Sequence, residues 1–284
     1  MRATECVGPQ DAADQAAGLR RLIASRDTGM LALSGADAES YLPLALDLAA
    51  ASERDGRRVL LLDLTRGVMA RQLGLTMRYE LMHVIDAHKR LDEVVVPGPR
   101  EVPLLPAVRG VRALANAWRG RSRFADFVER AGGAPQLVLA VAPAEELEIL
   151  AQIAAFATLV VVGPEGGADL KPCYTALKRA FAARAAVPRL IYAGLDAHAA
   201  RRAHARLIET SRAFLGGEPE LAGRLVADRA GEPREAPALR GLPCLSIDQL
   251  SRAIVRWQLP AMAAGTASRA APRSAGRAAN FVSP

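Results

Sequence analysis

The segment best suited to phosphate chemistry is residues 34–42, which read Ser-Gly-Ala-Asp-Ala-Glu-Ser-Tyr-Leu. They link an apolar run to a helical pattern, and backbone N–H groups at such a turn favour an anion. Phosphate binding there also needs glycines, a Lys that reaches the phosphates and a Ser or Thr for magnesium. Asp37 and Glu39 instead place negative charge in the turn, and no Gly-Lys pair occurs anywhere in the 284 residues. We therefore expect no productive binding of ATP and magnesium, and hence no nucleotide cofactor.

Two other strand ends could supply a carboxylate for a metal ion. Asp63 closes the apolar run 59–63, where it could hold magnesium or could equally form a turn or cap a helix. Leu64 and Thr65 add no second acid, and the run ending Ala140-Val141-Ala142-Pro143 contains none. Phosphoryl transfer depends on positioned cations and metal ligands, so these ends do not restore ATP hydrolysis.

The histidines and cysteines match no metal-binding or catalytic pattern. His83 and His88 are five residues apart and His198 and His204 six apart, whereas a pair on one helix face needs i, i+4 spacing. The three cysteines are widely separated, which favours reduced thiols in a cytoplasmic protein. We expect no metal site.

Short aliphatic runs alternate with longer helical patterns along the chain, which is typical of an α/β protein with a buried, mostly parallel sheet. The predicted strands are 30–34, 59–63, 102–105, 137–141, 159–162, 190–193 and 221–226. The predicted helices are 39–54, 145–156, 170–185, 197–215 and 247–257. The fold class is therefore a doubly wound sheet flanked by helices.

Composition divides the chain into three parts. Residues 1–27 contain a short amphipathic helix, residues 28–259 form the α/β domain, and residues 260–284 are a basic tail with little to bury, which we expect to be disordered. The net charge is +7, and three arginines of the tail account for 3 of it, which leaves +4. This modest excess does not favour a nucleic-acid partner.

Two segments bear on membrane contact. The apolar stretch 137–163 contains Glu145, Glu146 and Glu148, so it is too short for the ~20 apolar residues of a membrane span. The helix predicted at 246–257 has an apolar stripe with basic residues nearby, a pattern shared by membrane-surface helices and by helices that dock on their own domain. We favour docking over membrane contact.

Residues 14–20, Asp-Gln-Ala-Ala-Gly-Leu-Arg, resemble the Asp-Gln-Ala-x-x-Leu-Arg motif of the FlhG (FleN) family, MinD/ParA-type proteins that control flagellar number and placement. Residues 57–63 resemble that family's second strand, 169–178 one of its helices, and 199–216 its late helix ending Arg-x-Phe-Leu-Gly. The resemblance extends over about residues 11–258. It implies a MinD/ParA-like fold, which is a deviant P-loop NTPase fold.

The nucleotide loop departs from the pattern Lys-Gly-Gly-x-Gly-Lys-Thr of the resembled family. After Gly35, Ala36 takes the place of the signature lysine, Tyr41 that of the phosphate-binding lysine, and Leu42 that of the magnesium-binding threonine. The three glycines are replaced by Asp37, Ala38 and Ser40, and the two further family aspartates correspond to Thr65 and Ala140. Together with Asp63, these residues predict a degenerate site and a pseudo-ATPase.

The resemblance implies that the N-terminal helix binds an FlhF-like GTPase of the signal-recognition type and stimulates its hydrolysis. Its expected contact residues are Asp14, Gln15, Ala16, Leu19 and Arg20. Asp14 can cap the helix, Leu19 can anchor it in a groove, and Gln15 or Arg20 can enter the partner's active site. The alternative to this partner-binding role is a purely structural one, in which the helix packs on its own domain.

The resemblance further implies flagellar switch proteins or transcription regulators as partners, and recruitment to the cell pole or flagellar base. Two other hypotheses stay open. One is a MinD/ParA-type ATPase with a non-standard nucleotide site. The other is a degenerate positioning protein of pilus assembly, in which residues 14–20 match the motif by chance.

Overall fold

The computed structural model describes residues 28–36, 38–131, 133–163, 169–184, 187–225 and 242–267. The N-terminal motif at 14–20 lies outside these residues, as do Asp37 and residues 268–284.

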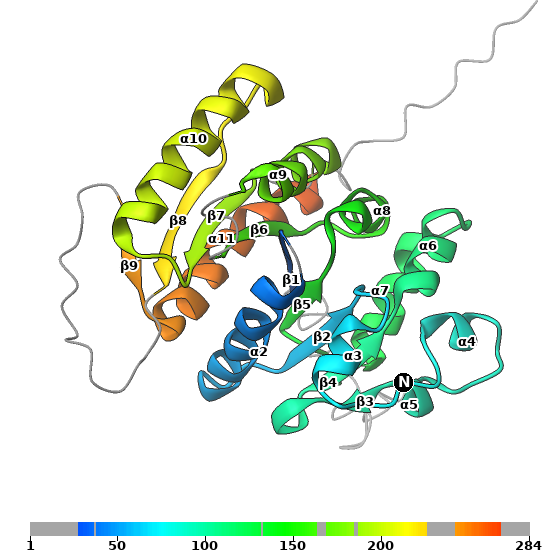
Figure 1. Ribbon diagram of the computed structural model, residues 1–284. Coiled ribbons are helices and arrows are strands. Elements are labelled where there is room, and N and C mark those ends of the chain that lie inside the picture. Colours follow the sequence, from blue (N-terminus) through cyan, green and yellow to red (C-terminus); the bar gives the residue numbers. More distant parts are fainter. Residues whose placement is uncertain are drawn as a thin grey trace, which may run out of the picture.

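One mixed sheet organises the described chain (Figure 1). Its nine strands follow the order β3-β4-β2-β5-β1-β6-β7-β8-β9. All neighbouring strands are parallel except β3 and β4, which are antiparallel. The strands are β1 (Gly29–Gly35), β2 (Val59–Asp63), β3 (Val96–Pro97), β4 (Pro103–Pro106), β5 (Leu137–Val141), β6 (Ala157–Val162), β7 (Arg189–Ala193), β8 (Glu220–Leu225) and β9 (Cys244–Leu245).

Helices cover both faces of this sheet (Figure 1). They are α2 (Ala38–Arg54), α3 (Val68–Gln72), α4 (Leu81–Ile85), α5 (Leu91–Val94), α6 (Val108–Ala115), α7 (Gly120–Ala131), α8 (Leu147–Ile153), α9 (Lys171–Ala183), α10 (Ala197–Leu215) and α11 (Ile247–Ala267), with 3-10 turns η1 (Pro99–Glu101) and η2 (Ala144–Glu146).

The central strands are buried on both sides because their residues alternate between two layers of helices. In β1, Leu31 and Leu33 pack in a cluster that includes side chains of α2 and α11. Met30 and Ala32 face the opposite cluster, which includes α6, α7 and α8. A third cluster joins α9 and α10 to β6 and β7. The predicted doubly wound, mostly parallel fold is confirmed.

The elements predicted after residue 28 are all present, but α7 and several shorter elements were missed; the helix predicted within residues 1–27 lies outside the described residues. The strands 59–63 and 137–141 and the helix 197–215 have the predicted bounds, and the other strands differ by one or two residues. β3 and β9 have two residues each, too few for a detectable alternation. α11 continues past residue 259, where we expected the domain to end, because the alanine-rich segment after Pro260 favours helix.

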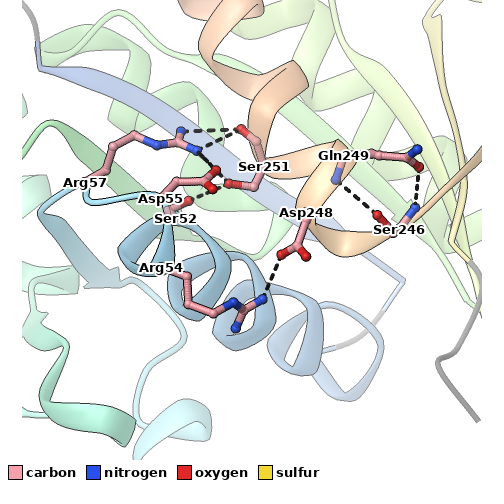
Figure 2. A network of polar contacts seen from close by, with 8 residues as sticks. All are labelled: Ser52, Arg54, Asp55, Arg57, Ser246, Asp248, Gln249 and Ser251. Atoms are coloured by element: carbon pink, nitrogen blue, oxygen red, sulfur yellow. Dashed lines mark hydrogen bonds and ion pairs between the residues drawn. The ribbon is translucent and has the colours of Figure 1, made fainter. Parts of the chain in front are cut away.

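The docking of α11 on α2 combines apolar contacts with a network of polar contacts, and Figure 2 shows the polar network. Leu250 and Ile254 are fully buried against the cluster that includes α2. The buried hydroxyls of Ser52 and Ser251 lie 3.1 Å apart, and Arg57 donates to the Ser251 hydroxyl at 2.7 Å. Such buried hydrogen bonds contribute about 1 kcal/mol each. The prediction that this helix docks on its own domain is confirmed.

Weaker contacts extend the same helix pair. Arg54 pairs with Asp248 at 2.7 Å, but both side chains are half exposed, so this pair adds about 0–1 kcal/mol to stability.

No helix of the described segments has the length and apolar character needed to cross a bilayer.

Candidate functional site

A cavity of about 450 Å³ lies at the carboxyl ends of the central strands. In the strand order, β2 to β5 lie on one side of β1 and β6 to β9 lie on the other. The strand order therefore reverses at β1, and ligands of doubly wound folds bind at such a point. The lining residues come from the segments after β1, β2 and β5 and from α9: Gly35, Ala36, Tyr41, Thr65, Arg66, Val68, Pro143, Ala144, Glu145, Pro172 and Thr175. The fold therefore keeps a cavity at the place of a nucleotide site.

Tyr41 and Leu42, which we expected at the phosphate-lysine and magnesium-threonine positions, belong to the core. Tyr41 and Leu42 in the first turns of α2 are each 2% exposed and pack in the cluster with β1 and β6. A Cβ atom on Gly35 would lie 3.0 Å from Cδ1 of Tyr41 and 2.9 Å from the carbonyl oxygen of Val161. Gly35 is thus required by the close approach of the Tyr41 ring and of β6.

The rest of the degenerate loop supplies no cation that the structure describes. Ala36 is partly buried and packs on the cluster of α9 and α10. Ala38 and Ser40 begin α2, and Asp37 lies outside the described residues.

Asp63 is engaged in forming a turn. It is 3% exposed, and its Oδ1 accepts hydrogen bonds from the Thr65 backbone N–H at 2.7 Å and hydroxyl at 2.6 Å. The Thr65 Oγ1 in turn accepts from the N–H of Met69 in α3 at 2.9 Å. Burial raises the pKa of Asp63, the hydrogen bonds from Thr65 oppose this rise, and the charge of Glu80 adds to it. Asp63 could have held magnesium or formed a turn or helix cap, and the hydrogen bonds to Thr65 are those of a turn.

The positions of the two further family aspartates carry no acid, but a carboxylate that the sequence did not single out lies nearby. Thr65 is 4% exposed and Ala140 fully buried. Glu146, in the turn after β5, is also fully buried and accepts from Arg66 Nη2 at 3.0 Å. Arg112 of α6 donates its Nε to Oε2 at 3.1 Å and pairs with Oε1 as well.

This buried carboxylate holds three segments together. A buried charge is costly unless it is paired, and Glu146 gains two guanidinium partners, each about half exposed. The loop after β2, the turn after β5 and α6 are thereby fixed relative to one another. Arg66 has a left-handed backbone, with φ 54, a conformation uncommon for a residue with a side chain.

Two of the four histidines, His83 and His204, take structural roles. His83 Nδ1 accepts from the N–H of Glu80 at 3.1 Å at the start of α4. His204 Nδ1 lies 3.0 Å from the hydroxyl of Tyr192, and burial lowers the pKa of His204. Across the described segments, no three His, Cys, Asp or Glu side chains form a group that could hold a metal ion.

Comparison with known proteins identifies the fold. No family model and no curated protein matches the chain. Among solved structures, it is similar to the MinD cell division protein of Aquifex aeolicus, with a TM-score of 0.50 at 15% identity over 86% of this chain and 99% of that one. The MinC:MinD cell division protein complex of the same organism gives a TM-score of 0.50 at 15% identity, over 87% and 99% of the two chains. The chain therefore has the α/β fold of MinD.

Replacing Tyr41 with lysine tests whether position 41 belongs to the core. Tyr41→Lys should lower the free energy of unfolding by about 2–5 kcal/mol, because it places an ammonium group in an apolar cluster. Tyr41→Phe keeps the ring and should cost about 1 kcal/mol or less. Urea denaturation measures both. Wild-type stability for Tyr41→Lys would mean that the lysine reaches the cavity, as a phosphate-binding residue does.

The pH dependence of stability tests the role of Asp63. A carboxyl whose folded-state pKa is raised binds its proton more tightly in the folded protein, so its ionisation lowers stability as pH rises through that pKa. Asp63→Asn retains an oxygen for both Thr65 bonds and removes this loss. The stability of Asp63→Asn relative to wild type should therefore be greater at pH 8 than at pH 4 in urea denaturation. The opposite trend would show that the folded site favours ionised Asp63, as a cation-binding site would.

Proposed function

We propose that this chain is a regulatory pseudo-ATPase: a MinD-like scaffold that controls flagellar number and placement by binding other proteins. The observation that carries the proposal is the burial of Tyr41 and Leu42 in the core. In the family that the sequence resembles, these positions hold the phosphate-binding lysine and the magnesium-binding threonine.

The charges around the cavity also oppose a triphosphate. Arg66 is the basic residue among the lining residues, and Glu146 already binds it. Glu145 lines the same cavity and adds a negative charge. Phosphoryl transfer relies on several cations that neutralise developing charge, and this arrangement offers none that is uncommitted. Neither ATP nor magnesium is therefore part of the proposed activity.

The proposed partner is an FlhF-like GTPase, and the proposed contact is residues 14–20. The support is the sequence motif that ends in Leu19 and Arg20, placed ahead of a domain with the fold of MinD. A MinD of this fold is known in a complex with MinC, so the fold supports protein binding. In this account the domain positions the activating helix, at the cell pole or flagellar base. Flagellar switch proteins and transcription regulators are further proposed partners.

A second candidate is a MinD/ParA-type ATPase with a non-standard site. The observation in its favour is the 450 Å³ cavity, which remains at the position where the fold binds a nucleotide. Magnesium-dependent ATP turnover by the whole chain would select this candidate.

GTP hydrolysis by the cognate FlhF-type GTPase tests the leading proposal. The whole chain, and a peptide of residues 11–25, should each accelerate hydrolysis. In the whole chain, Gln15→Ala should reduce the acceleration more than the affinity, because a residue that orients the attacking water acts mainly in the transition state. Leu19→Asp should instead abolish binding, because it places a charge against an apolar groove.

The GTPase assay can also refute the proposal. If neither the chain nor the peptide changes the GTPase rate, or if Gln15→Ala has no effect, the match at residues 14–20 is accidental and the assigned partner is wrong.

A further inference from the structure

A second cavity, of about 510 Å³, lies beside the first at the carboxyl ends of β2 and β4. It is lined by the loop after β2, the segment that leads into α4 and the start of α6. Four arginines contribute to its walls: Arg66, Arg78, Arg109 and Arg112. Arg66 lines both cavities.

Three of these arginines pair with carboxylates of the described segments, and the fourth, Arg78, does not. Arg109 pairs with Glu80, whereas Arg66 and Arg112 share the single carboxylate of Glu146. Arg78 is exposed, and no hydrogen bond or ion pair joins it to another residue in the part of the chain that the structure describes. Asp63 is the remaining acid of the lining, and burial raises its pKa.

The wall already shows how it holds a carboxylate. Glu80 Oε2 accepts from the backbone N–H of Arg109, in the first turn of α6, at 3.1 Å. The other oxygen of Glu80 bonds to the guanidinium of the same arginine. A backbone N–H at a helix start and a guanidinium together are a common way to bind an anion. Arg78 belongs to the same wall and has its donors free for a second anion.

The rest of the lining suits the body of a small molecule. Met77, Tyr79, Pro106 and Val108 provide apolar surface. The Tyr79 ring is held by His83 at its edge, with ring centroids 5.3 Å apart, and by Lys89 Nζ 4.6 Å from its centroid. Ligand cavities are typically about 300–1,000 Å³, mostly apolar with a few polar groups that orient the ligand. This cavity fits that description.

We propose that this cavity binds a small organic anion, whose phosphoryl or carboxylate group is held by Arg78. The site is separate from the degenerate nucleotide loop and adjoins it through Arg66. A ligand bound there contacts the loop after β2, which Glu146 couples to the turn after β5.

Thermal unfolding of the whole chain against increasing inorganic phosphate tests this site, with potassium chloride at matched ionic strength as the reference. A second series uses malonate, to distinguish a phosphoryl group from a carboxylate. At least one anion should raise the melting temperature beyond the chloride reference in a saturable way. Arg78→Gln should weaken that binding about tenfold, the effect of losing a charged hydrogen bond. Since Arg78 is exposed, this variant should fold normally.

Arg201→Gln is the matched control, because Arg201 is an exposed arginine of α10 away from the cavity. Its anion binding should equal that of the wild type. Saturable binding of one anion alone would show whether the site prefers a phosphoryl or a carboxylate group. Saturable binding of both would show that it accepts either anionic group. If neither anion exceeds chloride, or if the Arg78 and Arg201 variants lose binding equally, the cavity is not an anion site.

Discussion

The packing of Tyr41 and Leu42 against the central strands is the contact on which the rest of the site depends. It anchors the start of α2 to β1 and β6 and requires a glycine at position 35. Residues that bind phosphate in related loops gain little from burial, whereas a buried aromatic ring and a leucine stabilise the domain by about 1.5–3 kcal/mol each. The first turn of this fold has therefore become part of its core.

A second constraint lies on the other side of the cavity. Glu146 is fully buried and needs Arg66 and Arg112 as partners, so the loops after β2 and β5 cannot separate without exposing an unpaired charge to the interior. They are held to each other by side chains of the chain itself, which suits a scaffold whose surfaces must keep their shape.

The sequence was sufficient for the architecture. β2 and β5 were predicted with their bounds because strands buried on both faces are unbroken apolar runs. The bounds of α10 follow from Asp196, which caps its first turn, and from Gly216, whose φ of 65 ends it. The pairing of Glu146 with Arg66 joins positions 80 residues apart, and no local pattern in one sequence predicts such a contact. Likewise, the sequence shows that position 41 holds a tyrosine and not a lysine. It does not show that this ring is buried, because the burial depends on packing against β6, which is far away in the sequence.

The cavity at the carboxyl ends of the central strands, which Gly35 lines, should not bind ATP. Thermal unfolding with and without ATP and magnesium tests this central claim most directly. In the Arg78→Gln variant, in which anion binding by the neighbouring cavity is weakened, the account predicts the same melting temperature in both conditions. A ligand present at 100 times its dissociation constant would stabilise the folded chain by about 2.7 kcal/mol. A saturable, magnesium-dependent rise in melting temperature would contradict the account and show a working nucleotide site.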